Sequence, residues 1–350
     1  MNRGETLAYL AGVVDGDGYF VVAKDFRTSR TVHPYYRTTL GVQQLWPGKA
    51  LRLFALVFDG KVTLYPSSAG ALMARCELHG QKCAAATRRL LPYLLMKKSQ
   101  ALVSLDVGRL RREAQAGSAE GYARLESARQ TALSLNDGSW TRSGILLPVA
   151  AVLRGYGRLG PVELGWTKRE IHAYLAGVVD SDGNLRIEKK RVRDMLGPNY
   201  RINIRCAQVV PSPALELFAK TFGGRLAVRK SQSPNERDLV SWSLHDRAAM
   251  RAVEALAPYV IVKLAEANLL PDLRHLKAEG KHGETEWVHA NRWRDSVKMR
   301  KRCYTSEQVA AFERIYRAVQ ALHSAAPNSY RLVPAAGLTE NSRKSPDLPR

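Results

Sequence analysis

The pattern of apolar and polar residues changes its period several times along the chain. Apolar residues spaced three and four apart predict helices, whereas apolar residues at every second position predict half-buried strands. The elements expected in the first half are a helix over about 6–14, strands over 19–26 and 34–45, a helix over 48–60 that Gly60 closes, strands over 61–67 and 71–78, and helical segments from about Gln81 onward with a break at Pro92. This order is typical of an α+β domain with an antiparallel sheet.

The second half of the chain repeats the first half. The repeated blocks begin at Tyr9, Tyr36 and Leu90 in the first copy and at Tyr174, Tyr200 and Leu256 in the second. Strands are therefore expected again near 184–192, 200–210, 225–231 and 239–245. Two long copies predict a pseudo-twofold pair of domains, because a solenoid needs more and shorter repeats.

The repeat also suggests how the chain is divided. We expect a first domain over 1–138 that ends in an added helix, a linker over 139–165, a second domain over 166–324 and a disordered tail over 325–350. The tail is rich in Pro, Ser, Asn and charge and has few large apolar residues, so it has little apolar surface to bury.

Composition points to a polyanionic partner. The chain has 350 residues, with 54 Lys and Arg against 32 Asp and Glu and a formal net charge of +22. Nucleic acid is the first expectation, because no basic amphipathic helix suited to an anionic membrane is evident. No apolar run approaches the roughly 20 residues of a spanning helix, and the first residues do not form a signal peptide. The four cysteines form no CxxC pair, so we expect an intracellular protein with reduced thiols and no zinc cluster.

Two short motifs resemble ligand-binding loops but lack the required context. GYGRLG over 155–160 matches a dinucleotide fingerprint, yet Pro161 and the short stretch after it provide no helix for a pyrophosphate. DGDGYF over 15–20 resembles the start of a calcium loop, yet Tyr19 and Phe26 stand where oxygen ligands are needed. The histidines form neither an HExxH motif nor an obvious Ser-His-Asp order.

The repeated run YLAGVVD is the strongest candidate for chemistry. Its small residues recur at helical spacing, for example Ala8 with Gly12, which predicts that two such helices pack at close range. Their ends would then bring Asp17 and Asp182 together, with the adjacent glycines turning the chain sharply out of each helix. Two carboxylates about 6 Å apart repel by roughly 3 kcal/mol at an effective dielectric near 20. A divalent cation would relieve this repulsion, and oxygen ligands suit Mg²⁺.

The two runs and the matching blocks that follow them resemble the LAGLIDADG homing endonucleases in their single-chain, two-motif form. The resemblance spans about residues 6–268 and includes a PYxxxK block after each second hairpin. It implies two αββαββα domains whose antiparallel sheets form a DNA-binding saddle. It also implies an intron-encoded monomer that makes a staggered double-strand break in a long asymmetric duplex by Mg²⁺-dependent phosphodiester hydrolysis, with Mn²⁺ or Ca²⁺ as other possible occupants of the site.

The resemblance assigns roles to individual residues. Asp17 and Asp182 would bind the metal, together with the carbonyl groups of Gly16 and Ser181. The first acids of the motifs, Asp15 and Asp180, would be structural. The residues implied near the scissile phosphates are Gln44 and Gln208, which would order water, and Lys97 and Lys263, which would line the pocket. Gln43 remains an alternative to Gln44, and Lys98 lies next to Lys97.

The same resemblance places basic strand residues against the major groove and the phosphates. These residues are Lys24, Arg27, Arg37, Arg186, Lys189, Arg201, Arg205, Arg229 and Lys230. Two other classes of function stay open: a non-cleaving nucleic-acid-binding protein on the same scaffold, either an RNA maturase or a DNA-binding regulator, and a basic structural protein of a ribonucleoprotein. The last of these leaves the duplicated Gly and Asp positions without a purpose.

Overall fold

The computed structural model describes residues 1–25, 34–114, 119–137, 164–191, 198–230, 237–279, 285–292, 295–302 and 304–328. The first half contains α1 (Arg3–Asp17), β1 (Gly18–Asp25), β2 (Tyr35–Leu45), α2 (Lys49–Phe58), β3 (Lys61–Pro66), β4 (Leu72–His79), α3 (Gly80–Leu90), α4 (Lys98–Ala114) and α5 (Ala119–Asp137). The second half contains α8 (Lys168–Asp182), β5 (Gly183–Arg191), β6 (Pro198–Val209), α9 (Pro213–Phe222), β7 (Arg225–Arg229), β8 (Leu239–His245), α10 (Asp246–Leu256), α11 (Leu264–Glu279), β9 (Thr285–Arg292), β10 (Asp295–Arg302) and α12 (Ser306–Asn328).

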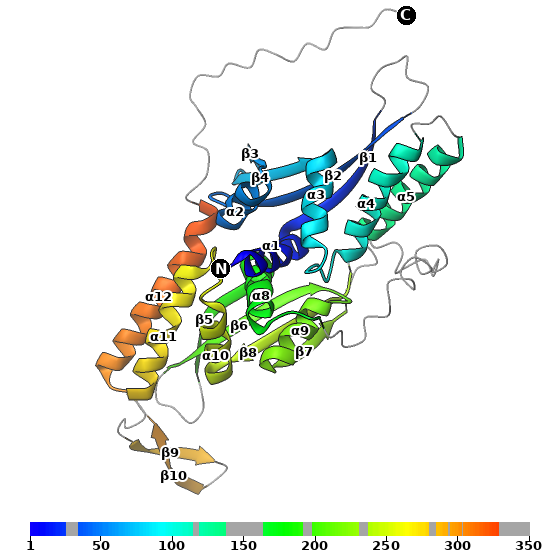
Figure 1. The fold of residues 1–350 in the computed structure, drawn as a ribbon. Helices are drawn as coiled ribbons and strands as arrows, with labels where there is room; N and C mark the ends of the chain where they lie inside the picture. Colours follow the sequence, from blue (N-terminus) through cyan, green and yellow to red (C-terminus); the bar gives the residue numbers. More distant parts are fainter. Residues whose placement is uncertain are drawn as a thin grey trace, which may run out of the picture.

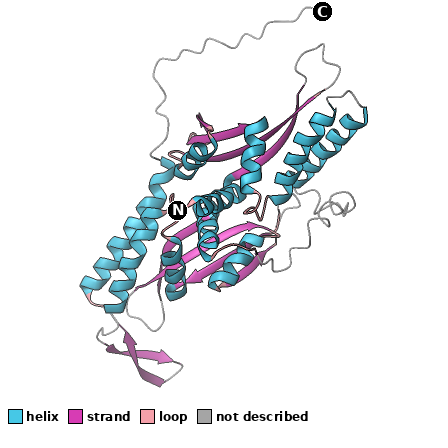
Figure 2. Cartoon of the chain, viewed as in Figure 1, coloured by secondary structure: helices cyan, strands magenta, loops and turns pink. Residues whose placement is uncertain are grey.

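Each half forms one four-stranded antiparallel sheet with the same strand order, β1-β2-β4-β3 and β5-β6-β8-β7. Helices pack against both sheets (Figure 2). Alternate strand residues such as Phe20 and Leu40, which pair across β1 and β2, are buried beneath these helices. The residues between them lie on the other side of the sheet, which we call the open face. The α+β class and the repeated αββαββα order predicted from the sequence are confirmed.

The two halves meet along α1 and α8, which cross in the middle of the molecule (Figure 1). Their backbones touch at two glycines. A Cβ atom on Gly12 would lie 2.2 Å from the carbonyl oxygen of Tyr174, and one on Gly177 would lie 2.1 Å from that of Tyr9. Only glycine fits at these positions, as the close packing predicted from the sequence requires.

Both central helices begin at capping boxes, which fix their starts at equivalent places. The Asn2 side chain accepts the N–H of Glu5 at 2.9 Å, and the Thr167 hydroxyl accepts that of Glu170 at 3.2 Å. The second box also joins the halves, because the Tyr93 hydroxyl donates to Glu170 at 2.7 Å.

A further helix is appended to each half at an equivalent place. α5 packs on α4 and β1, and α12 packs on α11 and β5, at opposite ends of the molecule (Figure 1). In each half a glutamate of the appended helix accepts a hydrogen bond from a tyrosine and pairs with a lysine of the sheet. These Lys-Tyr-Glu triads are Lys24, Tyr36 and Glu126 in the first half and Lys189, Tyr200 and Glu313 in the second.

The structure differs from the sequence prediction in four places. α12 and the β9–β10 hairpin were not expected, and α12 covers residues 325–328 of the predicted tail. Helix α2 ends before Asp59, which takes the left-handed conformation with φ 52°, rather than at Gly60. The α1 helix continues to Asp17, three residues past the predicted end.

Several expectations concern residues outside the described part of the chain. The predicted linker lies there except for residues 164 and 165, as do the GYGRLG motif and residues 329–350 of the tail. Cys303 lies there as well, whereas Cys76, Cys83 and Cys206 are buried free thiols. None of the described helices combines the length and apolar character needed to cross a lipid bilayer.

Candidate nucleic-acid cleavage site

Asp17 and Asp182 are the last residues of α1 and α8, and a glycine follows each of them. The chain leaves each helix abruptly at these glycines, as expected, because Gly18 and Gly183 already begin the next strand with φ of −87° and −85°. A Cβ atom at Gly18 would lie 2.6 Å from the carbonyl oxygen of Val14. These glycines are therefore required by the close passage of the strand over the helix end, not by a left-handed turn.

The two helix ends meet across the pseudo-twofold axis. A Cβ atom on Gly16 would lie 2.3 Å from Cβ of Ser181 and 3.1 Å from Oδ2 of Asp182. The Ser181 hydroxyl points back along its own helix and donates to the Gly177 carbonyl at 3.0 Å. The carboxylate of Asp182 is thus close enough to raise the pKa of Asp17 by its charge.

Gln44 and Gln208 hold the two carboxylates from the central strands β2 and β6. Gln44 donates from Nε2 to Oδ2 of Asp17 at 2.8 Å, and Gln208 donates in the same way to Asp182 at 2.8 Å. Each amide oxygen also accepts one hydrogen bond near the start of the following helix, at 3.1 and 2.6 Å. Gln43 lies on the open face and is exposed, so the structure places Gln44, not its neighbour, at the acid.

Lys97 and Lys263 lie behind the acids and bind the ends of the helices. The Lys97 amine donates to three carbonyl oxygens in the last turn of α1, among them that of Gly16 at 2.9 Å. Lys263 donates to two carbonyl oxygens of α8, both at 2.7 Å. These cations sit where the helix dipole is negative. The neighbouring Lys98 is exposed. The Gly16 carbonyl group, which the resemblance implies as a metal ligand, accepts a hydrogen bond from Lys97 in this structure.

The site is partly buried and carries opposing charges. Burial raises the pKa of Asp17, and the charge of Asp182 adds to the shift, while Gln44 and the two lysines oppose it. Burial lowers the pKa of Lys97 against the attraction of the neighbouring aspartates. The oxygen atoms brought together at the helix ends are those of the Asp17 and Asp182 carboxylates, which suit hard divalent cations. Within the described chain, no group of three or more His, Cys, Asp and Glu side chains forms a metal cluster.

The first acids of the motifs fix the geometry around the site. Asp15 accepts three backbone N–H groups from the segment before α4, at 2.8 to 3.1 Å, and Asp180 accepts three from the segment before α11, at 2.7 to 3.0 Å. Each also accepts a tyrosine hydroxyl from the other half. Tyr174 donates to Asp15 at 2.8 Å and Tyr9 donates to Asp180 at 2.7 Å. The carboxylates therefore tie each lysine-bearing segment to both halves.

Strand register decides which of the predicted basic residues lie on the open faces. Arg37, Arg186, Arg201, Arg205 and Arg229 are on the open faces, and Lys230 is exposed just after β7. Arg27 lies outside the described residues.

Lys24 and Lys189 do not lie on the open faces with the other predicted basic residues. Both lie on the helix-covered face, in register with the buried Tyr36 and Tyr200, and form ion pairs of 2.9 and 2.7 Å with the appended helices.

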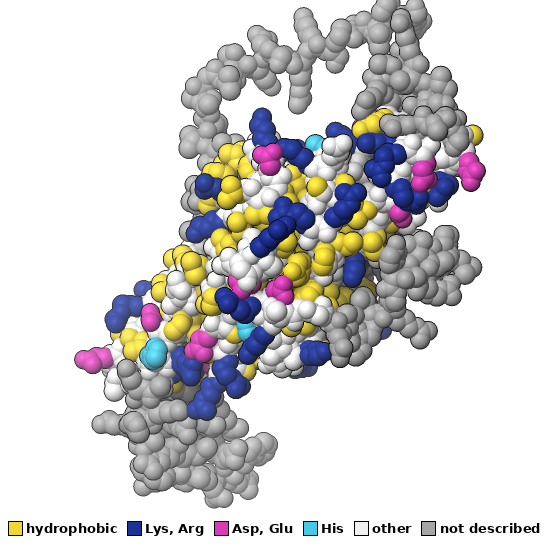
Figure 3. Space-filling view, viewed as in Figure 1, with side chains coloured by type: hydrophobic (Ala, Val, Ile, Leu, Met, Phe, Trp, Pro, Cys, Tyr) yellow, Lys and Arg dark blue, Asp and Glu magenta, His cyan; other side chains and the backbone are white. Residues whose placement is uncertain are grey.

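The open faces also carry charged residues that sequence reasoning missed. Arg75, Lys190 and Arg225 lie there, as does Glu188. Counting alternate positions from the buried strand residues would have found them, because the side-chain period of a strand is two. In the view of Figure 3, Lys and Arg side chains are spread over the surface among apolar and uncharged ones.

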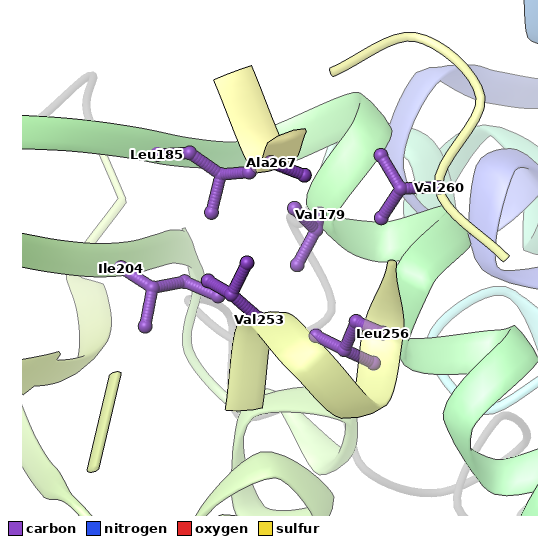
Figure 4. A pocket seen from close by; sticks show the side chains of 7 residues that line it. All are labelled: Val179, Leu185, Ile204, Val253, Leu256, Val260 and Ala267. Atoms are coloured by element: carbon purple, nitrogen blue, oxygen red, sulfur yellow. The ribbon is translucent and has the colours of Figure 1, made fainter. Parts of the chain in front are cut away.

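An apolar pocket lies in the core of the second half (Figure 4). Its lining residues are Val179, Leu185, Ile204, Val253, Leu256, Val260 and Ala267. Because none of these side chains offers a polar atom, the pocket is part of the packed core and adds nothing to the site.

No protein-family model matches the sequence, and no curated protein matches it. Solved structures do match the fold. I-SmaMI bound to an uncleaved DNA target with calcium ions has a TM-score of 0.61 at 13% identity, over 90% of this chain and 98% of that one. The I-LtrWI LAGLIDADG homing endonuclease bound to target DNA also scores 0.61, at 14% identity and with the same coverage of both chains. The LAGLIDADG meganuclease I-AabMI bound to uncleaved DNA scores 0.58 at 16% identity, over 89% and 98%. The chain therefore has the two-domain, single-chain fold of the LAGLIDADG homing endonucleases.

Proposed function

We propose that this protein is a DNA endonuclease that binds a long asymmetric duplex and makes a staggered double-strand break by metal-dependent phosphodiester hydrolysis. The observation that carries the proposal is the meeting of Asp17 and Asp182 at the ends of two helices, each held by a glutamine. Solved structures with the same fold support it, since I-SmaMI has been crystallised with both uncleaved and cleaved DNA.

The donor set at the helix ends fits Mg²⁺. Asp17 and Asp182 would hold the ion, with the carbonyl group of Ser181 as a further ligand and that of Gly16 available if Lys97 moves. The calcium ions bound with I-SmaMI are consistent with a divalent cation in this fold. When bound, such a cation supplies Lewis-acid charge to the scissile phosphodiester.

The side chains around the acids have separate tasks. Gln44 and Gln208 each fix one carboxylate oxygen, so the remaining lone pairs of Asp17 and Asp182 keep a defined direction. Lys97 and Lys263 place positive charge beneath the same atoms, where it would stabilise negative charge that develops on the phosphate. One chain supplies both acids, so we infer that a monomer is sufficient.

The open faces would bind the duplex on either side of the cleavage site. Arginines dominate them, and guanidinium groups suit bidentate contacts with phosphates and with guanine. If six to ten phosphates are contacted, affinity should fall by about 10³- to 10⁵-fold between 50 and 200 mM salt. An affinity that does not change with salt concentration would contradict the proposed binding to DNA.

The test is cleavage of a randomised or host-derived duplex library with Mg²⁺ by the parent and by the Asp17→Asn and Asp182→Asn variants. We expect the parent to cut and both variants to lose cleavage while retaining binding. Asp106→Asn, a change at a half-exposed position of α4, is the matched control and should cut like the parent.

A stability measurement shows that the loss of cleavage is not misfolding. Because burial and the neighbouring carboxylate raise the pKa of Asp17, its ionised form opposes folding at neutral pH without metal. Asp17→Asn should therefore raise the thermal midpoint of the metal-free protein. Cleavage that persists in both variants would refute the site, and binding without cleavage by the parent would favour the non-cleaving alternative.

A further inference from the structure

The open faces of the two sheets differ in charge although the cores beneath them match. The charged residues of the first open face are Asp25, Arg37, Lys61, Arg75 and Glu77, which is three basic against two acidic. Those of the second open face are Arg186, Glu188, Lys190, Arg201, Arg205, Arg225 and Arg229, which is six basic against one acidic. The second sheet therefore presents the more positive surface to a duplex.

Among the described strand residues of that second face, Glu188 is the single carboxylate, and basic and amide groups surround it. Its Oε1 accepts Nη2 of Arg186 at 2.6 Å and Nδ2 of Asn203 at 3.0 Å, and its Oε2 pairs with Lys190 at 2.6 Å. The Glu188 side chain is only 12% exposed, whereas Arg186 is 39% and Lys190 53% exposed. The carboxylate thus lies beneath its partners, and their cationic ends lie nearer the solvent.

The first half has no such arrangement. At the equivalent positions of β1 it carries Val21, Ala23 and Asp25, and Thr39 stands in place of Asn203. The cluster is therefore not required by the fold, since the first sheet forms without it. It belongs to the part of the molecule that differs between the halves.

The position of Glu188 favours an orienting role over direct contact with the backbone of DNA. A carboxylate repels phosphate, so a contact between Glu188 and the duplex backbone would be unfavourable. A guanidinium group that is held through one nitrogen keeps its remaining donors in a fixed plane. Guanine offers two acceptors, O6 and N7, in the major groove, and they match such a planar fork.

We propose that Glu188 is a positioning residue that holds Arg186 for recognition of a guanine, and that this guanine lies in the half of the target bound by the second sheet. The inference rests on the proposed DNA-binding function and deepens it by naming the base and the half-site. Asn203 supports the arrangement from β6, because it binds the same carboxylate oxygen.

The experiment compares base preferences in a selection from randomised duplexes, with Ca²⁺ as the metal, for the parent, Arg186→Gln, Glu188→Gln and Glu188→Asp. The parent should prefer guanine at one position by about 5- to 150-fold, the range expected for a bidentate contact. Arg186→Gln should abolish this preference, Glu188→Gln should reduce it strongly, and Glu188→Asp should retain part of it. Preferences in the other half-site should not change.

Glu216→Gln is the matched control, because it removes one negative charge from an exposed position of α9 on the helix side of the same half. It should leave every base preference unchanged. Thermal midpoints close to that of the parent would show that the Glu188 variants fold.

Three results would overturn the inference. Unchanged preferences in Arg186→Gln and Glu188→Gln would remove the guanine contact. If the Glu188→Gln variant bound all sequences more tightly or more weakly by the same factor, Glu188 would have a purely electrostatic effect. A parent that selects no sequence at all would overturn the proposed function itself, which distinguishes the two failures.

Discussion

At the scale of single residues, the difference between the two motifs has a steric origin. Gly16 in the first motif faces Ser181 in the second, and a Cβ atom on Gly16 would overlap Cβ of Ser181 at 2.3 Å. The space across the axis holds one side chain but not two. The serine at position 181 of the second motif therefore requires the glycine at position 16 of the first.

This pairing predicts the outcome of a swap. Gly16→Ser alone should destabilise the protein by about 1–3 kcal/mol, the usual cost of overpacking, and should lower cleavage. The double variant Gly16→Ser/Ser181→Gly exchanges the two sides of the axis and should recover most of both losses. A thermodynamic cycle from denaturant unfolding measures the coupling. Additive effects of the two changes would contradict the pairing.

At the scale of helices and strands, the approach of α1 to α8 depends on glycine at two points. Gly12→Ala should destabilise the protein by about 1–3 kcal/mol although alanine favours helix formation, because the added methyl group meets the Tyr174 carbonyl. Gly108→Ala in α4 is the control, since a Cβ atom there meets nothing within 4 Å. That change should stabilise the protein by up to about 1 kcal/mol. Urea unfolding of both variants checks the contrast, and equal signs would contradict it.

The Lys-Tyr-Glu triads predict how the appended helices respond to acid. The bonds from Tyr36 and Lys24 lower the pKa of Glu126 from 4.5 to about 2, and those from Lys189 and Tyr200 lower that of Glu313 to about 2. A lowered folded-state pKa contributes stability that is present above the unfolded value and is lost as the pH falls toward about 2.

Replacement of both glutamates by glutamine tests this contribution. Glu126→Gln/Glu313→Gln should unfold at a lower temperature than the parent at neutral pH, and the gap between the two proteins should shrink at about pH 3. Thermal unfolding at both pH values gives the comparison. A gap that is independent of pH would show that the glutamates act through packing alone.

At the scale of the whole molecule, one apolar core runs through both halves. It includes Leu10 and Val13 of α1, Leu175 and Val179 of α8, and the buried residues of both sheets. The cross-axis hydrogen bonds of Tyr9 and Tyr174 lie inside it. Each half therefore buries part of its apolar surface against the other half, and an isolated half would expose that surface to water.

A shared core predicts a single cooperative unfolding transition for the full chain. Differential scanning calorimetry should show one peak whose calorimetric and van't Hoff enthalpies agree. The proposed metal site needs both helix ends in place, so divalent cations should shift the whole peak to higher temperature. Two resolved transitions would contradict the shared core.

Most of the repeated elements and the acids could be predicted from sequence, and the reasons are local. The apolar periods typical of strands and helices recur in both copies, so each repeated element could be predicted independently from two segments. α12 was missed because it has no sequence counterpart in the first half, although it occupies the place that α5 takes there. Lys24 and Lys189 were assigned to the wrong face because the strand ends there extend past the central core, beside the appended helices.

By itself the sequence determined the duplication, the antiparallel sheets, the place of Asp17 and Asp182 after the two repeated helices and the excess of positive charge, because periodicity, motif spacing and charge are properties of the chain. Only the tertiary structure decided that Gln44 rather than Gln43 donates to Asp17 and that Lys97 binds the carbonyl groups at the end of α1. It also decided that Gly16 faces Ser181. These contacts join residues far apart in the chain, so their partners and distances depend on how the two halves pack rather than on any local pattern.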